Sequence, residues 1–267
     1  MLSERPPVLL DVRWQLGSDA GASDYRAGHI PGAVFADLDA DLADPPSPSA
    51  GRHPLPSLDR LQAAARRWGI DDDSPVVVYD DIGNLAAARA WWVLRWAGLT
   101  DIRLLDGGVG AWRSAGRRVS AGDTRPRPGS VTLRPGMLPT VSADDVAEIS
   151  RGAAAGLLLD ARAAERYRGE VEPVDPRAGH IPGAVSMPTA ANIDADGRFL
   201  PVAGLRARFA AVVNGAQPVV VYCGSGVNAA HQLVALELAG YSGVLYPGSW
   251  SQWSNDPTRP AAVGVGP

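Results

Sequence analysis

Short apolar runs alternate with helical patterns along the first half of this 267-residue chain. Continuous runs of branched and aliphatic residues predict strands at Val8–Val12, Val76–Tyr79 and Ile102–Leu105. Apolar residues at helical spacing predict helices at Leu58–Trp68 and Ala86–Ala97. Strands that alternate with helices in this way indicate an α/β fold, in which a parallel sheet has helices on both faces.

The second half of the chain has the same alternation. Strands are predicted at Gly156–Asp160, Val219–Tyr222 and Val244–Tyr246, and helices at Val202–Val213 and Val227–Ala239. The same fold is therefore expected twice.

Direct sequence repeats support this duplication. The heptapeptide Gly-His-Ile-Pro-Gly-Ala-Val occupies residues 28–34 and recurs without change at 179–185. The run Val-Val-Val-Tyr ends at Tyr79 in the first copy and at Tyr222 in the second. A period of this length indicates two duplicated domains and not a solenoid. We predict a first domain over 1–120, an Arg-, Pro- and Gly-rich linker over 121–140, and a second domain over 141–267.

The two copies differ at the residue that follows the Val-Val-Val-Tyr strand, which is Asp80 in the first copy and Cys223 in the second. Cys223 is the only cysteine, and it begins the segment Cys-Gly-Ser-Gly-Val-Asn that leads into a predicted helix. A glycine-rich loop between a strand and a helix directs backbone N–H groups and the positive helix end toward its contents. Such a loop favours a sulfur anion, so Cys223 is predicted to be a nucleophile.

Together, these motifs resemble the rhodanese superfamily, and the resemblance covers nearly the whole chain. The paired heptapeptides, the Leu-Asp-Gly-Gly before Trp112, and the loop that begins at Cys223 carry this resemblance. It implies two tandem rhodanese-like domains, of which the first, with Asp80 in place of cysteine, is catalytically silent. It also implies a sulfurtransferase that forms a persulfide on Cys223.

The resemblance implies a sulfur donor and an acceptor but no cofactor. The loop sequence is similar to that of relatives that use 3-mercaptopyruvate, because the neutral Gly224 and Ser225 stand where thiosulfate-type relatives have basic residues. Thiosulfate is the alternative donor, with cyanide as a possible acceptor. Thioredoxin and low-molecular-weight thiols are the other expected acceptors.

Several residues are expected to bind the donor. Arg166 stands at the position of the family's substrate-binding arginine, and Arg177 lies where 3-mercaptopyruvate-type relatives have a second arginine, although the loop here is shorter. Arg162 is equally well explained by a structural ion pair with Asp160. The expected loop contacts are Gly224, Gly226, Val227 and Asn228, the last replacing a threonine that is common in the family.

The resemblance also suggests a proton relay formed by Ser225, His53 and Asp39. A histidine oriented by a carboxylate transfers protons well near neutral pH. The alternative is that the Pro-rich segment around His53 is only a rigid surface loop. The paired His29 and His180 are expected to fix their loops by hydrogen bonds, because both copies have them.

The amino-acid composition excludes several classes of partner. The net charge of −4, without a basic cluster, argues against nucleic acid and anionic membranes as partners. No stretch has the length and apolar character of a membrane span or a signal peptide. One cysteine and four scattered histidines predict no metal site. A single cysteine also fits a reducing compartment, so a cytoplasmic location is expected.

Three other protein classes also use a reactive cysteine. Phosphatases and arsenate reductases of this fold have an arginine six residues after the cysteine, where this chain has Ala229, so that chemistry is disfavoured. A redox sensor would need a resolving cysteine, which the chain does not have. A persulfide carrier without turnover remains an alternative that the sequence does not separate from the enzyme.

Overall fold

The computed structural model describes residues 6–215 and 217–266, and these form two compact units. Unit 1 comprises residues up to 44, residues 55–138 and residues 195–198, and unit 2 comprises residues 45–54, 139–194 and 199 onward. Segments 45–54 and 195–198 thus belong to a different unit from their neighbours in the sequence, and residues 121–138 of the predicted linker belong to unit 1. Segment 45–54 matters most for the site, because it contains His53 and belongs to unit 2.

Unit 1 is built on a four-stranded parallel sheet with the order β2-β1-β3-β4. Its elements, in chain order, are β1 (Val8–Asp11), α1 (Gly21–Ala27), β2 (Val34–Phe35), α2 (Leu38–Asp41), α3 (Leu58–Arg67), β3 (Val76–Tyr79), α4 (Leu85–Trp96), β4 (Ile102–Leu104) and α5 (Gly108–Ser114). The central strand β3 and the helix α4 that follows it are almost entirely buried, which explains their continuous apolar sequences.

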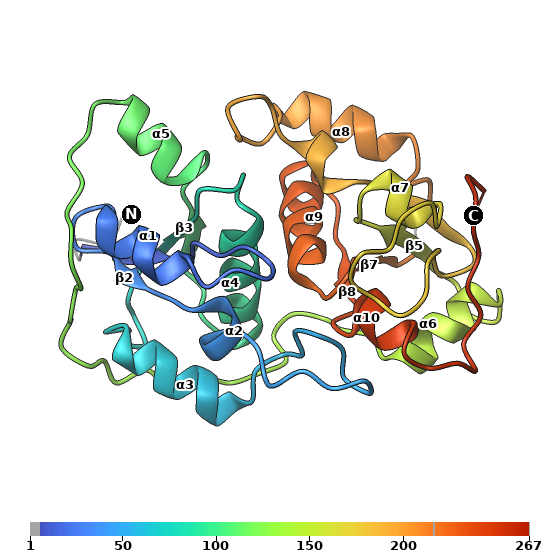
Figure 1. Ribbon diagram of the computed structural model, residues 1–267, viewed down its shortest axis with the longest axis horizontal. Helices are drawn as coiled ribbons and strands as arrows, with labels where there is room; N and C mark the ends of the chain where they lie inside the picture. The colour runs from blue at the N-terminus through green and yellow to red at the C-terminus, as the bar shows by residue number, and fades with distance from the viewer. Residues whose placement is uncertain (1–5, 216, 267) are drawn as a thin grey trace. The chain divides into compact units, whose positions relative to one another are not determined.

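Unit 2 has the same parallel topology, with the strand order β6-β5-β7-β8. Its elements are α6 (Ala143–Ser150), β5 (Leu157–Asp160), α7 (Ala164–Tyr167), β6 (Ala184–Ser186), η1 (Thr189–Asn192), α8 (Val202–Ala210), β7 (Val219–Tyr222), α9 (Val227–Leu238), β8 (Val244–Leu245) and α10 (Ser249–Trp253). Helices α8 and α9 lie on one face of this sheet, and α6, α7 and α10 lie on the other (Figure 1). The predicted α/β fold with a duplicated parallel sheet is therefore confirmed.

The carboxyl ends of β7 and β8 are packed in the hydrophobic core of unit 2. Tyr222 of β7, Tyr246 directly after β8, and Trp250 of α10 pack with residues of α6 and α7, and all three are at most 1% exposed. Tyr222 also accepts the N–H of Ile181 through its hydroxyl (3.1 Å), and Tyr79 does the same for Ile30 in unit 1. Burial raises the pKa of Tyr222 well above its usual value, so this phenol stays neutral.

The repeated histidines have the structural contacts that were predicted for them. His29 Nδ1 lies 2.9 Å from the carbonyl of Tyr25, and His180 Nδ1 lies 2.8 Å from the carbonyl of Tyr167. Each imidazole also stacks on the same tyrosine ring, with centroids 4.1 and 3.7 Å apart. The heptapeptide therefore serves in both units to close the turn before the second strand.

Among the described residues, no helix is both long enough and apolar enough to cross a membrane.

Candidate active site

Cys223 lies at the carboxyl end of the central strand of unit 2. All four residues of β7 are buried, and the chain leaves this strand through Cys223-Gly224-Ser225-Gly226 before α9 begins at Val227. Gly226 has φ +83°, a left-handed conformation that favours glycine at this turn. The sharp turn brings the N–H of Gly226 to 3.1 Å from the Cys223 Sγ. The thiol is thereby held in the predicted loop, at the amino end of a 12-residue helix.

Hydrogen bonds with residues of α10 hold the backbone of the cysteine loop in place. The Ser249 Oγ accepts the N–H of Cys223 (3.1 Å), and the Cys223 carbonyl accepts the N–H of Trp250 (2.9 Å). The N–H of Ser251 donates to the Gly224 carbonyl (2.8 Å). These contacts leave the Cys223 residue 2% exposed and fix the loop backbone on both sides of the sulfur.

Segment 45–54 brings His53 to the same loop. Gly51, at φ +90°, lies so close to α10 that a Cβ atom would be 2.6 Å from the Gly248 carbonyl oxygen. The next N–H, of Arg52, donates to Ser251 Oγ (3.0 Å). His53 Nδ1 then lies 2.7 Å from Ser225 Oγ, and both residues are buried.

The other predicted relay residue, Asp39, lies on α2 in unit 1. Its carboxylate accepts a hydrogen bond from Trp14 Nε1 (2.9 Å). The structure thus brings the histidine and the serine of the predicted relay together within unit 2, and Asp39 keeps its role as a prediction.

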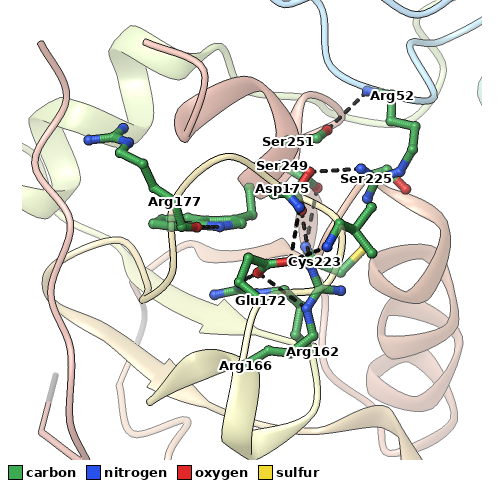
Figure 2. Close-up of polar contacts among 12 residues, drawn as sticks. Arg52, Arg162, Arg166, Glu172, Asp175, Arg177, Cys223, Ser225, Ser249 and Ser251 are labelled. Atoms are coloured by element: carbon green, nitrogen blue, oxygen red, sulfur yellow. Dashed lines mark hydrogen bonds and ion pairs between the residues drawn. The ribbon is translucent and has the colours of Figure 1, made fainter. Parts of the chain in front are cut away.

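Two arginines lie beside the cysteine loop on the side of Gly224. A Cβ atom on Gly224 would lie 3.2 Å from Arg52 Nη2 and 3.4 Å from Arg166 Nη1. Figure 2 shows that Arg166 comes from α7 and Arg52 from segment 45–54. Arg166 was predicted as a donor-binding residue, whereas Arg52 was missed by the sequence analysis, although it directly precedes His53. An anion near Gly224 would meet both guanidinium groups.

Arg177 has different contacts from those expected of a second donor-binding arginine. Its guanidinium donates to four backbone carbonyls, those of Trp253, Ser254, Asp256 and Arg259, at 2.8–2.9 Å. Figure 2 shows its side chain extending away from Cys223 and Arg166. These bonds hold the segment after α10 and occupy the groups with which Arg177 would bind a carboxylate.

Arg162 has the structural role that was the alternative prediction for it. It is 2% exposed and forms a two-pronged ion pair with Asp160, in which Nε donates to Oδ1 (3.1 Å) and Nη2 donates to Oδ2 (2.7 Å). It also donates to the Gly179 carbonyl (2.6 Å), and its guanidinium lies 4.7 Å from the centre of the Trp250 ring. Burial acts to lower the pKa of Arg162, but the charge and the hydrogen bonds of the Asp160 carboxylate outweigh this effect. The pKa of Arg162 is therefore raised.

The remaining predicted contacts follow the loop into the helix. Val227 is buried as the first residue of α9, and Asn228 Nδ2 lies 3.5 Å from Thr189 Oγ1. Asn228 therefore links the start of α9 to η1, and is partly exposed.

The equivalent loop of unit 1 is filled by its own carboxylate. Asp80 Oδ1 accepts the N–H groups of Ile82 (3.0 Å) and Asn84 (2.9 Å), and Oδ2 accepts that of Ala87 (2.9 Å). The backbone donors that an anion would use are thus satisfied within the loop. Replacement of the cysteine by aspartate therefore does more than remove a nucleophile, because it fills the loop.

The burial of Asp80 predicts a pH-dependent contribution to the stability of unit 1. Burial raises the pKa of Asp80 from 3.8 to about 6, against the opposing effect of the three N–H donors. Between these values the folded state binds more protons than the unfolded state, so this contribution to stability falls as pH rises. Relative to Asp80→Asn, we expect the wild type to lose about 2 kcal/mol between pH 4 and pH 6.5.

Hydrogen exchange of the β3 amides at these two pH values, corrected for intrinsic exchange rates, measures this difference in unit 1. Asp59→Asn, at an exposed position of α3, is the control and should give no such trend. A constant difference between wild type and Asp80→Asn across this pH range would contradict the prediction.

Comparison with known proteins agrees with this geometry. The sequence profile of the rhodanese-like domain matches residues 1–115 and 142–256. The chain belongs to the rhodanese family, with two copies of its domain. It is a sulfurtransferase, the activity for which the relatives described next are named.

A Mycobacterium tuberculosis protein named as a thiosulfate sulfurtransferase is 48% identical over 97% of this chain and 92% of its own length. A Pseudomonas aeruginosa protein named as a 3-mercaptopyruvate sulfurtransferase is 47% identical over 98% of this chain and 94% of its own length. The crystal structure of the Escherichia coli 3-mercaptopyruvate enzyme matches with a TM-score of 0.80 at 34% identity, over 91% of this chain and 92% of that one. The names of two similarly close relatives thus divide between the two donors.

Proposed function

We propose that this enzyme transfers sulfane sulfur from 3-mercaptopyruvate to a thiol acceptor through a persulfide on Cys223. One observation supports this donor above all. Next to the cysteine, the loop has no cationic side chain but has Ser225, whose Oγ lies 2.7 Å from His53 Nδ1. A donor whose leaving group must be protonated benefits from such a pair, whereas thiosulfate would benefit more from positive charge in the loop.

The first half-reaction is a displacement at sulfur. The Cys223 thiolate attacks the thiol sulfur of 3-mercaptopyruvate and forms the S–S bond of the persulfide. The bond between that sulfur and C3 breaks, and its electron pair goes to carbon as the enolate of pyruvate. Protonation of this enolate through Ser225 and His53 gives pyruvate. The N–H of Gly226, 3.1 Å from Sγ, stabilises the sulfur anion before attack.

The second half-reaction returns the enzyme to its starting state. An acceptor thiolate attacks the outer sulfur of the persulfide, and the Cys223 thiolate leaves. Thioredoxin and low-molecular-weight thiols are the acceptors proposed for this step, and cyanide would serve in the same way. The proposal includes a cytoplasmic location, supported by the single free cysteine, which must remain reduced for this chemistry.

Arg166 and Arg52 are proposed to bind the carboxylate of the donor, because both guanidinium groups lie beside Gly224. Arg166→Gln is expected to lower kcat/KM for 3-mercaptopyruvate roughly tenfold, the value of about one charge-assisted hydrogen bond. The loss should be mainly in KM. Steady-state kinetics would measure it, with Arg168→Gln as the matched control, since Arg168 lies two residues away and pairs with the exposed Glu170. Equal kinetics for the two variants would contradict this role.

The donor assignment is tested by steady-state sulfur transfer with 3-mercaptopyruvate and thiosulfate in parallel. The proposal predicts a higher kcat/KM for 3-mercaptopyruvate. A preference for thiosulfate would overturn the donor and leave sulfur transfer in place. If neither donor supports turnover while a persulfide still forms, the protein is a persulfide carrier.

A further inference from the structure

A carboxylate already lies between the two proposed donor-binding arginines. The Oδ1 atom of Asp175 accepts a hydrogen bond from Arg52 Nη1 (2.7 Å), and its Oδ2 accepts one from Arg166 Nη2 (3.0 Å). The side chain of Asp175 is only 2% exposed, whereas those of the two arginines are 21% and 18% exposed. Asp175 is therefore more deeply buried than the two guanidinium groups with which it pairs, and these retain partial access to solvent. Figure 2 shows its ion pairs with the arginines.

A second carboxylate continues this arrangement inward. Glu172 Oε1 accepts from Arg166 Nη2 (2.6 Å), and Glu172 Oε2 lies 3.4 Å from Arg162 Nη1. Arg162 in turn pairs with Asp160. The connected group contains three guanidinium groups and three carboxylates, namely Arg52, Arg162, Arg166, Asp160, Glu172 and Asp175. With every side chain ionised, its formal charge is zero.

We propose that Asp175 is a specificity-determining residue that keeps the donor site neutral, and so favours donors with one negative charge over donors with two. This inference rests on the proposed function and adds the residue that sets the charge of the site. 3-Mercaptopyruvate carries one full negative charge on its carboxylate near neutral pH, whereas thiosulfate is a dianion.

The geometry supports an effect on bound anions and not only on the arginines. Each guanidinium uses one nitrogen for Asp175 and turns a different nitrogen toward Gly224, Nη2 in Arg52 and Nη1 in Arg166. An anion bound there would interact with the same two cations as Asp175, and Asp175 would repel it in proportion to its charge.

Asp175→Asn tests this with little change in shape. We expect kcat/KM for thiosulfate, relative to that for 3-mercaptopyruvate, to rise roughly tenfold, with the change mainly in KM, since a unit charge a few ångströms from a partly exposed anion is removed. Glu170→Gln is the matched control, because it removes the same charge from the same loop but pairs only with the exposed Arg168. Its donor ratio should equal that of the wild type.

A binding measurement separates this inference from the proposed reaction. Calorimetry with sulfate, a dianion, and pyruvate, a monoanion, requires no turnover. Asp175→Asn should lower the Kd of sulfate relative to that of pyruvate roughly tenfold, and Glu170→Gln should not change this ratio. If the wild type turns over neither donor, the proposed reaction fails, and the sulfate-to-pyruvate ratio still decides the role of Asp175.

Ratios that are the same in Asp175→Asn and in the wild type, in both kinetics and binding, would overturn the inference. An equal rise in kcat/KM for both donors would also overturn the inference. It would indicate that loss of the ion pairs with Asp175 makes the arginines better ligands for any anion, and not that Asp175 selects donors by charge. If Asp175→Asn does not fold, Glu172→Gln removes a charge from the same connected group, and the same direction is expected in both measurements.

Discussion

Replacing Cys223 with serine is expected to lower kcat for both donors by on the order of 10⁴-fold or more, because the reaction loses its only nucleophile. The serine hydroxyl can keep the hydrogen bond from Gly226 N–H, but it stays protonated at neutral pH and forms no persulfide. Steady-state kinetics with 3-mercaptopyruvate and with thiosulfate would measure the loss.

The fold should tolerate this change, since serine is nearly isosteric with cysteine and the loop is fixed by backbone contacts with Ser249 and Trp250. Unchanged thermal unfolding and circular dichroism are therefore part of the expected result. Glu237→Gln, at an exposed position near the end of α9, is a control that should retain activity within about threefold, because it lies far along the helix from the cysteine loop. Substantial turnover by folded Cys223→Ser would rule out the persulfide mechanism.

His53→Asn is expected to lower kcat for 3-mercaptopyruvate by about 10²-fold, the value of one general acid. The amide can still bond to Ser225, which now lies 2.7 Å from the imidazole, but it cannot deliver a proton at neutral pH. With thiosulfate the loss should be less than about threefold, because the departing sulfite needs no proton. The comparison of kcat for the two donors in the same variant is the measurement.

This donor dependence separates proton transfer from a merely structural role. If His53→Asn lowers kcat by the same factor with both donors, the histidine only shapes the loop, and the relay is contradicted. Asp39→Asn extends the test to the acid that the family resemblance proposes for orienting His53. It should show the same donor dependence with a smaller loss.

The inner strands and their neighbouring helices in each unit could be predicted, because they are continuous segments with a clear pattern of buried apolar residues. Strands β3 and β7 are short apolar runs that pair on both sides, and the predicted helices at Leu58–Trp68 and Ala86–Ala97 match α3 and α4 within one residue at each end. Strands β2 and β6 were not predicted, because they have only two or three residues and no readable period. Helix α6 was not predicted either, although Ser142 and Asp145 form a capping box at its start.

The candidate site was predicted where a local motif specifies it, and missed where it depends on distant contacts. The Cys223 loop and Arg166 lie in recognisable motifs. The role of Arg52 depends on the close approach of Gly51 to α10, and no local pattern indicates that segment 45–54 joins unit 2. Likewise, the ion pairs of Asp175 could not be predicted from residue spacing in an irregular loop. The position of Arg177 suggested donor binding, whereas its contacts here are with backbone carbonyls, so its role in donor binding stays a prediction.

The most direct test of the persulfide mechanism is mass spectrometry of the intact protein after incubation with 3-mercaptopyruvate in the absence of an acceptor, followed by peptide mapping. A persulfide on Cys223 predicts a gain of one sulfur atom per chain. The added sulfur should be located on the peptide that contains Cys223, be lost on addition of a thiol acceptor, and be absent in Cys223→Ser. Pyruvate release without any sulfur on Cys223, or the same gain of mass in Cys223→Ser, would contradict this mechanism.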